Sequence, residues 1–264
     1  MYSVSKLGLS ATVIVLVAMA AHASAAQKPP PRGPGSLSGI WTNTSYNPDS
    51  VYDPRLAVLR DVHGNLPPMR PWAAELLEKR IKAAEEGHPY ANTKSMCLPS
   101  GVPQLMFGPR TPMQILETSG QVTMLIEEFN DFRIVLIHAK HAMDLDPNIM
   151  GDSVGRWEGD TFVVDTIGLS EQTTLDVSGM PHTDELHVVE RFRRAGDDLL
   201  EVLVTLDDPG TFTAPRTSRA TFKHAPVSKL TEYYCENQRN PSVDGKTITQ
   251  MPGELRPWHS AEPR

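Results

Sequence analysis

The stretch "PHTDELHVVERFRRAGDDLLEVLVTL", residues 181–206, holds two strand-like runs on either side of a short polar turn. In the second run every other residue from Leu200 to Leu206 is apolar, and the first run mixes apolar and charged residues, as strands with one face in a core do. The four residues between the runs, Ala195 to Asp198, are typical of a hairpin turn. Two histidines also lie here, so the same stretch raises the question of a polar site.

The alternating pattern recurs along the chain from Met113 onward. Similar runs lie at 113–118, 121–129, 132–138, 153–157, 161–166, 218–224 and 229–237, separated by Gly, Asn and Asp residues. We interpret them as successive antiparallel hairpins which, with a first strand at 37–44, make about ten strands. A meander of this kind loses its exposed edges when it closes into a barrel. The sequence therefore predicts an all-β fold, an antiparallel meander closing into a barrel.

One N-terminal helix is predicted over residues 71–87. Pro71 suits the first turn, Leu77 and Ile81 recur at helical spacing, and Gly87 ends the pattern. Residues 90–112 follow as a long irregular stretch with several prolines, and we expect a coil of this length to pack against another part of the protein.

The N-terminus has the pattern of a secretory signal peptide, residues 1–25. One lysine, Lys6, precedes an apolar run of residues 7–20, and "ASA" at 23–25 is typical of a cleavage site. We therefore expect a periplasmic or secreted protein. No later apolar run is long enough to predict a membrane span. The remaining chain is divided into a Pro-rich leader, a single barrel domain and a polar C-terminal tail, at 26–36, 37–237 and 238–264.

The chain is acidic, with a formal net charge of −7 and a pI near 5.7. Nucleic-acid binders usually carry a basic surface, so a nucleic-acid partner is not expected. The chain has two cysteines, Cys97 and Cys235, and in an oxidising compartment they predict one disulfide. Two buried free thiols are the alternative. The oligomeric state is left open.

Several motifs resemble those of known families. Gly39-Ile40-Trp41 on a first strand looks like the Gly-x-Trp start of the lipocalin or calycin superfamily. Three stretches, "MCLPSGVP" at 96–103, "GDSVGRWEGDTFVVDT" at 151–166 and "PHTDELHVVERF" at 181–192, together resemble a family of exported bacterial proteins abundant in proteobacteria. This similarity covers residues 36–237. It implies export and a lipocalin-like barrel, but it supplies no reaction.

The histidines of the opening stretch are the first candidates for a polar site. We expect His182, Asp184 and Glu185 in a loop at the mouth of the barrel, with His187 at the start of a wall strand. A carboxylate beside an imidazole sets its tautomer and raises its basicity, as a general base requires. A solvated loop of hydrogen-bonded polar residues is the alternative.

A second cluster is "HAKHAMDLD" at residues 138–146. His138 shares a strand face with Phe132, Ile134 and Leu136, so we expect it to point inward from the end of that strand, and His141 joins the site as a binding residue. Two histidines and two aspartates can bind a divalent metal. Their spacing matches no strong metal motif, so neither a metal nor another cofactor is predicted.

Charged residues also interrupt apolar strand runs. Asp165 and Glu190 are the carboxylates, and Arg133 and Arg191 are the arginines available to pair with them. Burying such charges is costly unless they are paired or used, so a structural ion pair and a site carboxylate are both open. Trp157 offers a flat apolar surface for a ligand, or else belongs to the core.

Two functions remain open. The first is an enzyme performing acid/base chemistry on a small molecule, as a lyase, isomerase or hydrolase, with His182, His187, His138, Asp165 and Glu190 as candidate catalytic residues. The candidate substrate-binding residues are Arg133, His141, Trp157, Asp184, Glu185 and Arg191. The second is a lipocalin-like carrier with no turnover. Ser153 in "GDSVG" is not expected to be a nucleophile, because a hairpin rather than a helix follows it.

Overall fold

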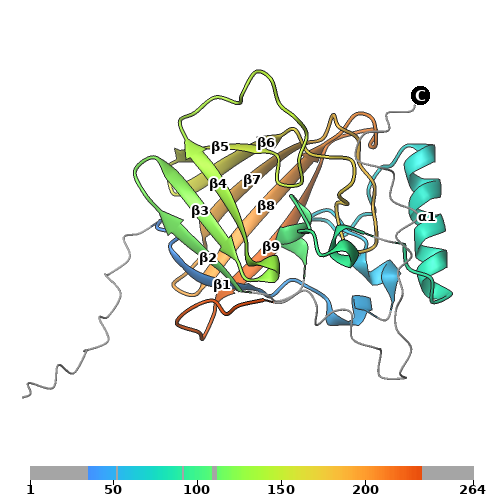
Figure 1. Ribbon diagram of the computed structural model, residues 1–264, viewed down its shortest axis with the longest axis horizontal. Helices are drawn as coiled ribbons and strands as arrows, with labels where there is room; N and C mark the ends of the chain where they lie inside the picture. The colour runs from blue at the N-terminus through green and yellow to red at the C-terminus, as the bar shows by residue number, and fades with distance from the viewer. Residues whose placement is uncertain (1–34, 52, 91, 109–111, 234–264) are drawn as a thin grey trace, which may run out of the picture. The chain divides into compact units, whose positions relative to one another are not determined.

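Nine strands close into a barrel in the computed structural model of the chain (Figure 1). The structure describes residues 35–51, 53–90, 92–108 and 112–233. The strands follow one another around the ring in chain order: β1 Gly39–Asn43, β2 Pro112–Glu117, β3 Gln121–Ile126, β4 Asp131–Ile137, β5 Asp152–Glu158, β6 Thr161–Ile167, β7 His187–Arg194, β8 Leu199–Asp207 and β9 Arg216–His224. The predicted all-β barrel is therefore confirmed.

One pair of neighbouring strands is parallel. A closed ring with an odd number of strands cannot alternate in direction all the way round, and in this barrel the exception is β4 beside β5. Every other pair is antiparallel, including β1 with β9, which closes the ring. The prediction of successive hairpins is wrong at this junction. Residues 138–151 instead return along the barrel, so that β5 starts at the same end as β4 (Figure 1).

The tenth predicted strand, 229–237, is not found where the structure describes it. Residues 229–233 have no strand structure, and residues 234–237 lie outside the described part. The physical reason is the pairing of β1 with β9, which leaves no free edge for another strand. Tyr233 is held instead by the side chain of Asn130, with its N–H 3.0 Å from Oδ1 and its carbonyl 2.7 Å from Nδ2.

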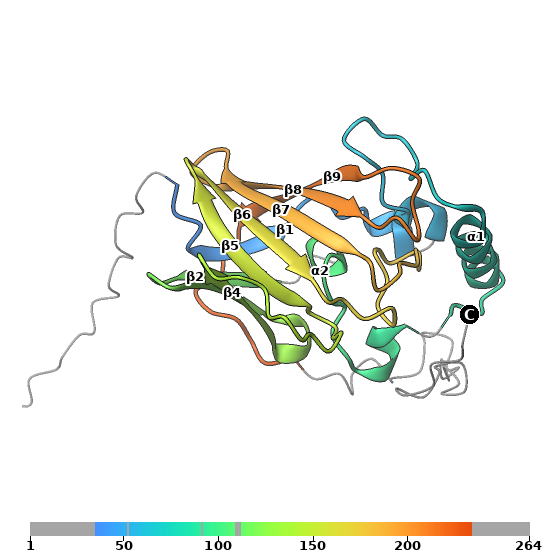
Figure 2. The ribbon, with the colours of Figure 1, turned by 90° about the horizontal axis from the view of Figure 1, so that it is seen from above.

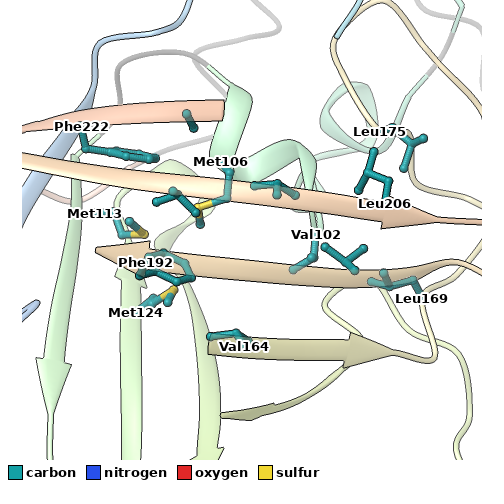
Figure 3. Packing of buried hydrophobic residues seen from close by; sticks show 14 of the residues in the cluster. Val102, Met106, Met113, Met124, Val164, Leu169, Leu175, Phe192, Leu206 and Phe222 are labelled. Carbon is teal, nitrogen blue, oxygen red and sulfur yellow. The ribbon is translucent and has the colours of Figure 1, made fainter. Parts of the chain in front are cut away.

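The interior of the barrel is a packed core. Side chains from all round the ring are fully buried, among them Ile115, Val122, Met124, Val135, Phe162, Val164, Phe192, Val202 and Val204. The irregular stretch before β2 contributes Val102 and Met106, which lie among barrel side chains such as Phe192 and Leu206 (Figure 3). Met106 belongs to the short helix α2, Gln104–Phe107. The expectation that this irregular stretch packs against another part of the protein is confirmed, and its partner is the barrel core.

The predicted helix is confirmed as α1, Pro71–Glu85, beyond one end of the barrel (Figures 1 and 2). It has Pro71 in its first turn and buries Ala73, Leu77 and Ile81. Short 3-10 turns, η1 Pro48–Val51, η2 Pro54–Ala57, η3 Thr93–Met96 and η4 Glu128–Asn130, complete the described helices. None of the helices in the described ranges has the length and apolar character of a membrane span.

The connection between β6 and β7 is buried although much of it is polar. Asp176 lies at its centre and accepts hydrogen bonds from its own loop and from the backbone N–H of Leu59, at 2.7 Å. Burial raises the pKa of Asp176, and the hydrogen bonds from Ser178 and the backbone partly oppose this. These bonds tie the loop to the segment before α1, so residues 168–186 form a fixed cap on the barrel.

The faces of β4 are reversed from the sequence prediction. Phe132, Ile134 and Leu136 are 58%, 44% and 47% exposed, whereas Arg133 and Val135 are buried in the barrel. The expectation that His138 shares an inward face with the first three is therefore wrong. Several predictions lie outside the described residues, namely the signal peptide at 1–25, nearly all of the leader, the tail at 238–264 and the disulfide partner Cys235, so these remain predictions.

Candidate functional site

Four side chains meet on the outer wall of the barrel, and we name them the outer cluster: Asp152, Asp165, His141 and His187. Asp152 begins β5, Asp165 lies on β6, and His187 begins β7. His141 comes from the segment that returns along the barrel between β4 and β5. The cluster therefore exists because that parallel junction brings residues 138–151 back over the sheet.

His141 lies between the two carboxylates. Its Nδ1 is 2.7 Å from Asp152 Oδ2 and its Nε2 is 3.1 Å from Asp165 Oδ1. The backbone N–H of Ala142 also donates to Asp152 Oδ2, at 3.3 Å. Carboxylate oxygens only accept hydrogen bonds, so both contacts are satisfied only when His141 carries a proton on each nitrogen. His141 therefore links the side chains of β5 and β6.

His187 and Asp165 form an imidazole–carboxylate pair. His187 Nε2 lies 2.8 Å from Asp165 Oδ1, so Nε2 carries a proton and donates it. This contact leaves Nδ1 as the acceptor nitrogen of the neutral ring, and the described residues provide no partner for it. The side chain of His187 is 40% exposed to solvent. An imidazole held in one tautomer by a carboxylate has the arrangement of a general base.

Glu190 and Arg133 belong to a different network inside the barrel. Arg133 Nη1 lies 3.1 Å from Glu190 Oε1, and Nη2 lies 2.5 Å from Oε2, in a two-point ion pair with both side chains almost fully buried. Arg133 also donates to Ser153 Oγ at 3.1 Å and to Thr166 Oγ1 at 2.8 Å. The structural ion pair open for Glu190 is thus confirmed, and Ser153 serves this network.

His182 is buried in the cap, away from the outer cluster's hydrogen bonds. Its Nδ1 donates to the carbonyl of Thr183 at 2.8 Å, and its Nε2 lies 2.7 Å from Thr173 Oγ1. Burial lowers the pKa of His182, although Thr183 and the carboxylates of Asp208, Glu171 and Asp184 oppose the shift. The ring is therefore held neutral with both nitrogens occupied. The expected pocket shared by His182, His187 and His138 is not what the structure forms.

The other predicted site residues lie apart from the outer cluster. His138 follows β4, is exposed and has a positive φ of 58°. Arg191 pairs with Glu158 at 2.8 Å, and Trp157 packs against Phe162 with the rings tilted and their centres 5.1 Å apart. Asp184 and Glu185 are exposed in the loop before β7. Of the predicted residues, only His187, Asp165 and His141 belong to the outer cluster, and Arg133 and Glu190 meet in the inner ion pair instead.

Asp152 is the cluster member that the sequence reasoning missed. The turn between β5 and β6 pairs Val154 with Asp165 and Asp152 with Ile167. Because side chains alternate along a strand, this register puts Asp152 and Asp165 on the same face. The turn at 158–160 was already visible in the sequence, so counting outward from it would have found Asp152.

Metal binding and a deep ligand cavity find no support in the described residues. No three or more of their His, Cys, Asp and Glu side chains are grouped as a metal site. The barrel interior is occupied by the core, and a shallow hollow beside Glu75, Lys79 and Lys82 belongs to the outer side of α1. Comparison with known proteins adds no assignment, because no family model and no curated protein matches the sequence.

Proposed function

We propose that the protein is an exported enzyme that performs acid/base chemistry on a small molecule at the outer cluster. The observation that carries the proposal is the 2.8 Å contact between His187 Nε2 and Asp165 Oδ1, together with the open Nδ1 on the same ring. A positioned histidine base contributes typically 10²- to 10⁴-fold to a reaction rate. The reaction class stays at lyase, isomerase or hydrolase.

In this proposal His187 Nδ1 removes a proton from the bound molecule or from an attacking water. The ring then carries a positive charge, which the carboxylate of Asp165 stabilises at 2.8 Å. The same proton returns to the product from Nδ1. His141 keeps Asp165 in place, because it joins Asp165 to Asp152 through its two nitrogens.

The alternative of a lipocalin-like carrier is supported less well. A carrier of that type holds its ligand in the barrel interior, and here the described interior is filled by Met124, Phe192 and their neighbours. The outer cluster, whose side chains are partly exposed, is more accessible to a substrate than the filled interior. The proposed location, periplasmic or extracellular, rests on the signal-like pattern of residues 1–25.

The first test needs no substrate. Nitrogen-detected NMR of the full chain is expected to show His187 with its proton on Nε2, and diethyl pyrocarbonate is expected to modify His187 rapidly and His182 slowly. Asp165→Asn removes the carboxylate, so the preference of His187 for Nε2–H should weaken. A His187 proton on Nδ1 in the wild type would overturn the proposed base.

The second test screens small-molecule lyase, isomerase and hydrolase substrates with wild type and His187→Gln. A turnover found in this way should fall by about 10²-fold or more in the variant. His88→Gln is the matched control, because His88 is an exposed histidine that follows α1 and has no part in the outer cluster. Equal turnover in His187→Gln and His88→Gln would refute the proposal.

A further inference from the structure

The hydrogen-bonding capacity left over in the outer cluster consists only of acceptors. Asp152 and Asp165 each use one oxygen in the contacts described above, which leaves Asp152 Oδ1 and Asp165 Oδ2 without a partner among the described residues. The open nitrogen of His187, Nδ1, is also an acceptor in this tautomer. A ligand that complements these atoms must therefore supply donors.

A third carboxylate lies beside the cluster. Asp207 of β8 is the direct cross-strand partner of His187, and directly opposed side chains have Cβ atoms about 4.5–5.5 Å apart. The half-buried Asp207 has no hydrogen bond or ion pair with another described side chain. Arg191, on the same strand as His187, is already paired with Glu158, and Lys140 is exposed on the returning segment. Three carboxylates, Asp152, Asp165 and Asp207, thus lie on this part of the outer face, so the surface favours a positively charged ligand.

An apolar surface adjoins the cluster on the same outer face. Leu136 of β4 pairs with Val154 of β5, and Val154 pairs with Asp165 of β6. Neighbouring strands lie about 4.8 Å apart, so Leu136 is roughly 10 Å from Asp165 across the sheet. Phe132 and Ile134 continue this exposed surface along β4. We name Phe132, Ile134 and Leu136 the apolar row.

We propose that the outer cluster takes an organic ammonium ion whose apolar body lies over the apolar row. The ammonium group supplies donors to the open oxygens of Asp152 and Asp165, the negative charge of Asp207 two strands away adds to the attraction, and His187 Nδ1 faces the reacting part of the molecule. The inference rests on the proposed function, because it names the substrate class of the same site.

The test is a titration of the full chain, followed by the His187 ring signals in NMR, with four probes: butylammonium, hexylammonium, 1-hexanol and hexanoate. Hexylammonium is expected to bind at least tenfold more tightly than 1-hexanol, and hexanoate least well. Each methylene added between butyl- and hexylammonium should raise the affinity by about two- to fourfold. Equal binding of hexanoate and hexylammonium would overturn the inference.

Two variants separate the charge from the apolar contact. Asp207→Asn should weaken both ammonium probes by the same factor, about fivefold or more at low salt, and Glu75→Gln on α1 is its exposed control. Leu136→Ser should reduce the gain from chain length and leave butylammonium less affected, and Leu66→Ser, which also changes an exposed leucine, is its control. Unchanged affinities in both test variants would contradict the proposed ligand.

Other outcomes have distinct meanings. Tight binding of Zn²⁺ that displaces hexylammonium from His187 and His141 would make this a metal site and overturn the inference. Absence of ammonium binding, in a protein whose turnover of another substrate requires His187, would overturn the ligand class and leave the acid/base function standing. Ammonium binding that depends on Asp207 and Leu136, with turnover unaffected by His187→Gln, would support the ligand class and refute the acid/base function.

Discussion

The inner and outer networks of this barrel occupy the two faces of the same strands. Ser153 and Thr166 point inward to Arg133, while the residues directly before them, Asp152 and Asp165, point outward to His141. Inside, the guanidinium and carboxylate of the ion pair are at most 1% exposed, whereas the histidines outside are 22% and 40% exposed. The same sheet therefore has a buried polar network on its inner face and a partly exposed one on its outer face.

The difference between the inner network and the outer cluster shows that buried polar groups serve stability, whereas exposed ones remain available for binding or catalysis. The inner network occupies both oxygens of Glu190 and all three nitrogens of the Arg133 guanidinium, because unpaired charge in a core is costly. The outer cluster keeps unused acceptors, because water can satisfy them until a ligand arrives. We expect changes inside to alter the free energy of unfolding, and changes outside to alter binding or rate.

Glu190→Gln is expected to have the largest effect on stability. It leaves the buried Arg133 without a counter-charge, and breaking a buried ion pair in this way costs about 3–5 kcal/mol. Urea unfolding of wild type and variant measures the loss. The double variant Arg133→Met with Glu190→Leu should recover much of it, because neither charge then remains. A loss below about 1 kcal/mol in Glu190→Gln would contradict the importance assigned to the pair.

His182 gives the next effect, which depends on pH. Its folded-state pKa is lowered by burial, so below the unfolded value of about 6.5 the unfolded chain binds a proton that the folded chain does not. The contribution of neutral His182 to the free energy of unfolding is therefore fully present above about pH 6.5. It decreases as the pH falls below that value, by at most about 1.4 kcal/mol per pH unit. His182→Asn should remove this part of the pH dependence. An identical slope in both proteins between pH 6.5 and 5 would refute the neutral buried histidine.

Asp165→Asn is expected to have a smaller effect on unfolding. Its contacts with His141 and His187 are partly exposed, and such pairs contribute about 0–1 kcal/mol. The variant should nevertheless lose turnover and change the His187 tautomer, because the base loses its carboxylate. Thermal unfolding and the NMR signals of His187 measure the two effects on one sample. A large loss of stability without a tautomer change would make Asp165 a structural residue.

His187→Gln is expected to change stability least. The ring has one hydrogen bond and is 40% exposed, so we expect a change within about 0.5 kcal/mol, as for surface substitutions generally. Turnover is expected to fall by about 10²-fold or more. The contrast with Glu190→Gln, which lies on the inner face of the same strand, tests the division between the two networks. A melting temperature lowered as much as in Glu190→Gln would contradict it.

Much of the barrel could be predicted because most strands, turns and the helix are indicated by the residues within each segment. The strands β7 and β8 each show alternating burial, β6 is a short apolar run beside its own turn, and the helix at 71–85 carries its own apolar spacing. The pairing of Glu190 with an arginine was also open to prediction, since both are charges within apolar runs. The choice of Arg133 over Arg191 was not, because it depends on which face of β4 turns inward.

Two features could not be predicted from short segments of sequence: which face of β4 is buried, and which residues form the outer cluster. Phe132, Ile134 and Leu136 are more apolar than the alternate set, so the local pattern favours them as the buried face. In the fold, Arg133 is the cross-strand partner of the buried Met124 and meets Glu190 from β7, and this pairing places Arg133 inside. Distant partners decide the orientation of such a strand, and no local pattern contains them.

The sequence by itself determined the strand periods, the turns and the helix, because these depend on neighbouring residues. Only the tertiary structure decided which histidine is buried and which is open: His182 lies under the cap, and His187 on the outer wall, five positions later. The parallel junction of β4 and β5 is equally non-local, since it follows from closing an odd number of strands into a ring. That junction brings His141 to Asp152 and Asp165, and ring closure is a property of the whole barrel rather than of any one segment.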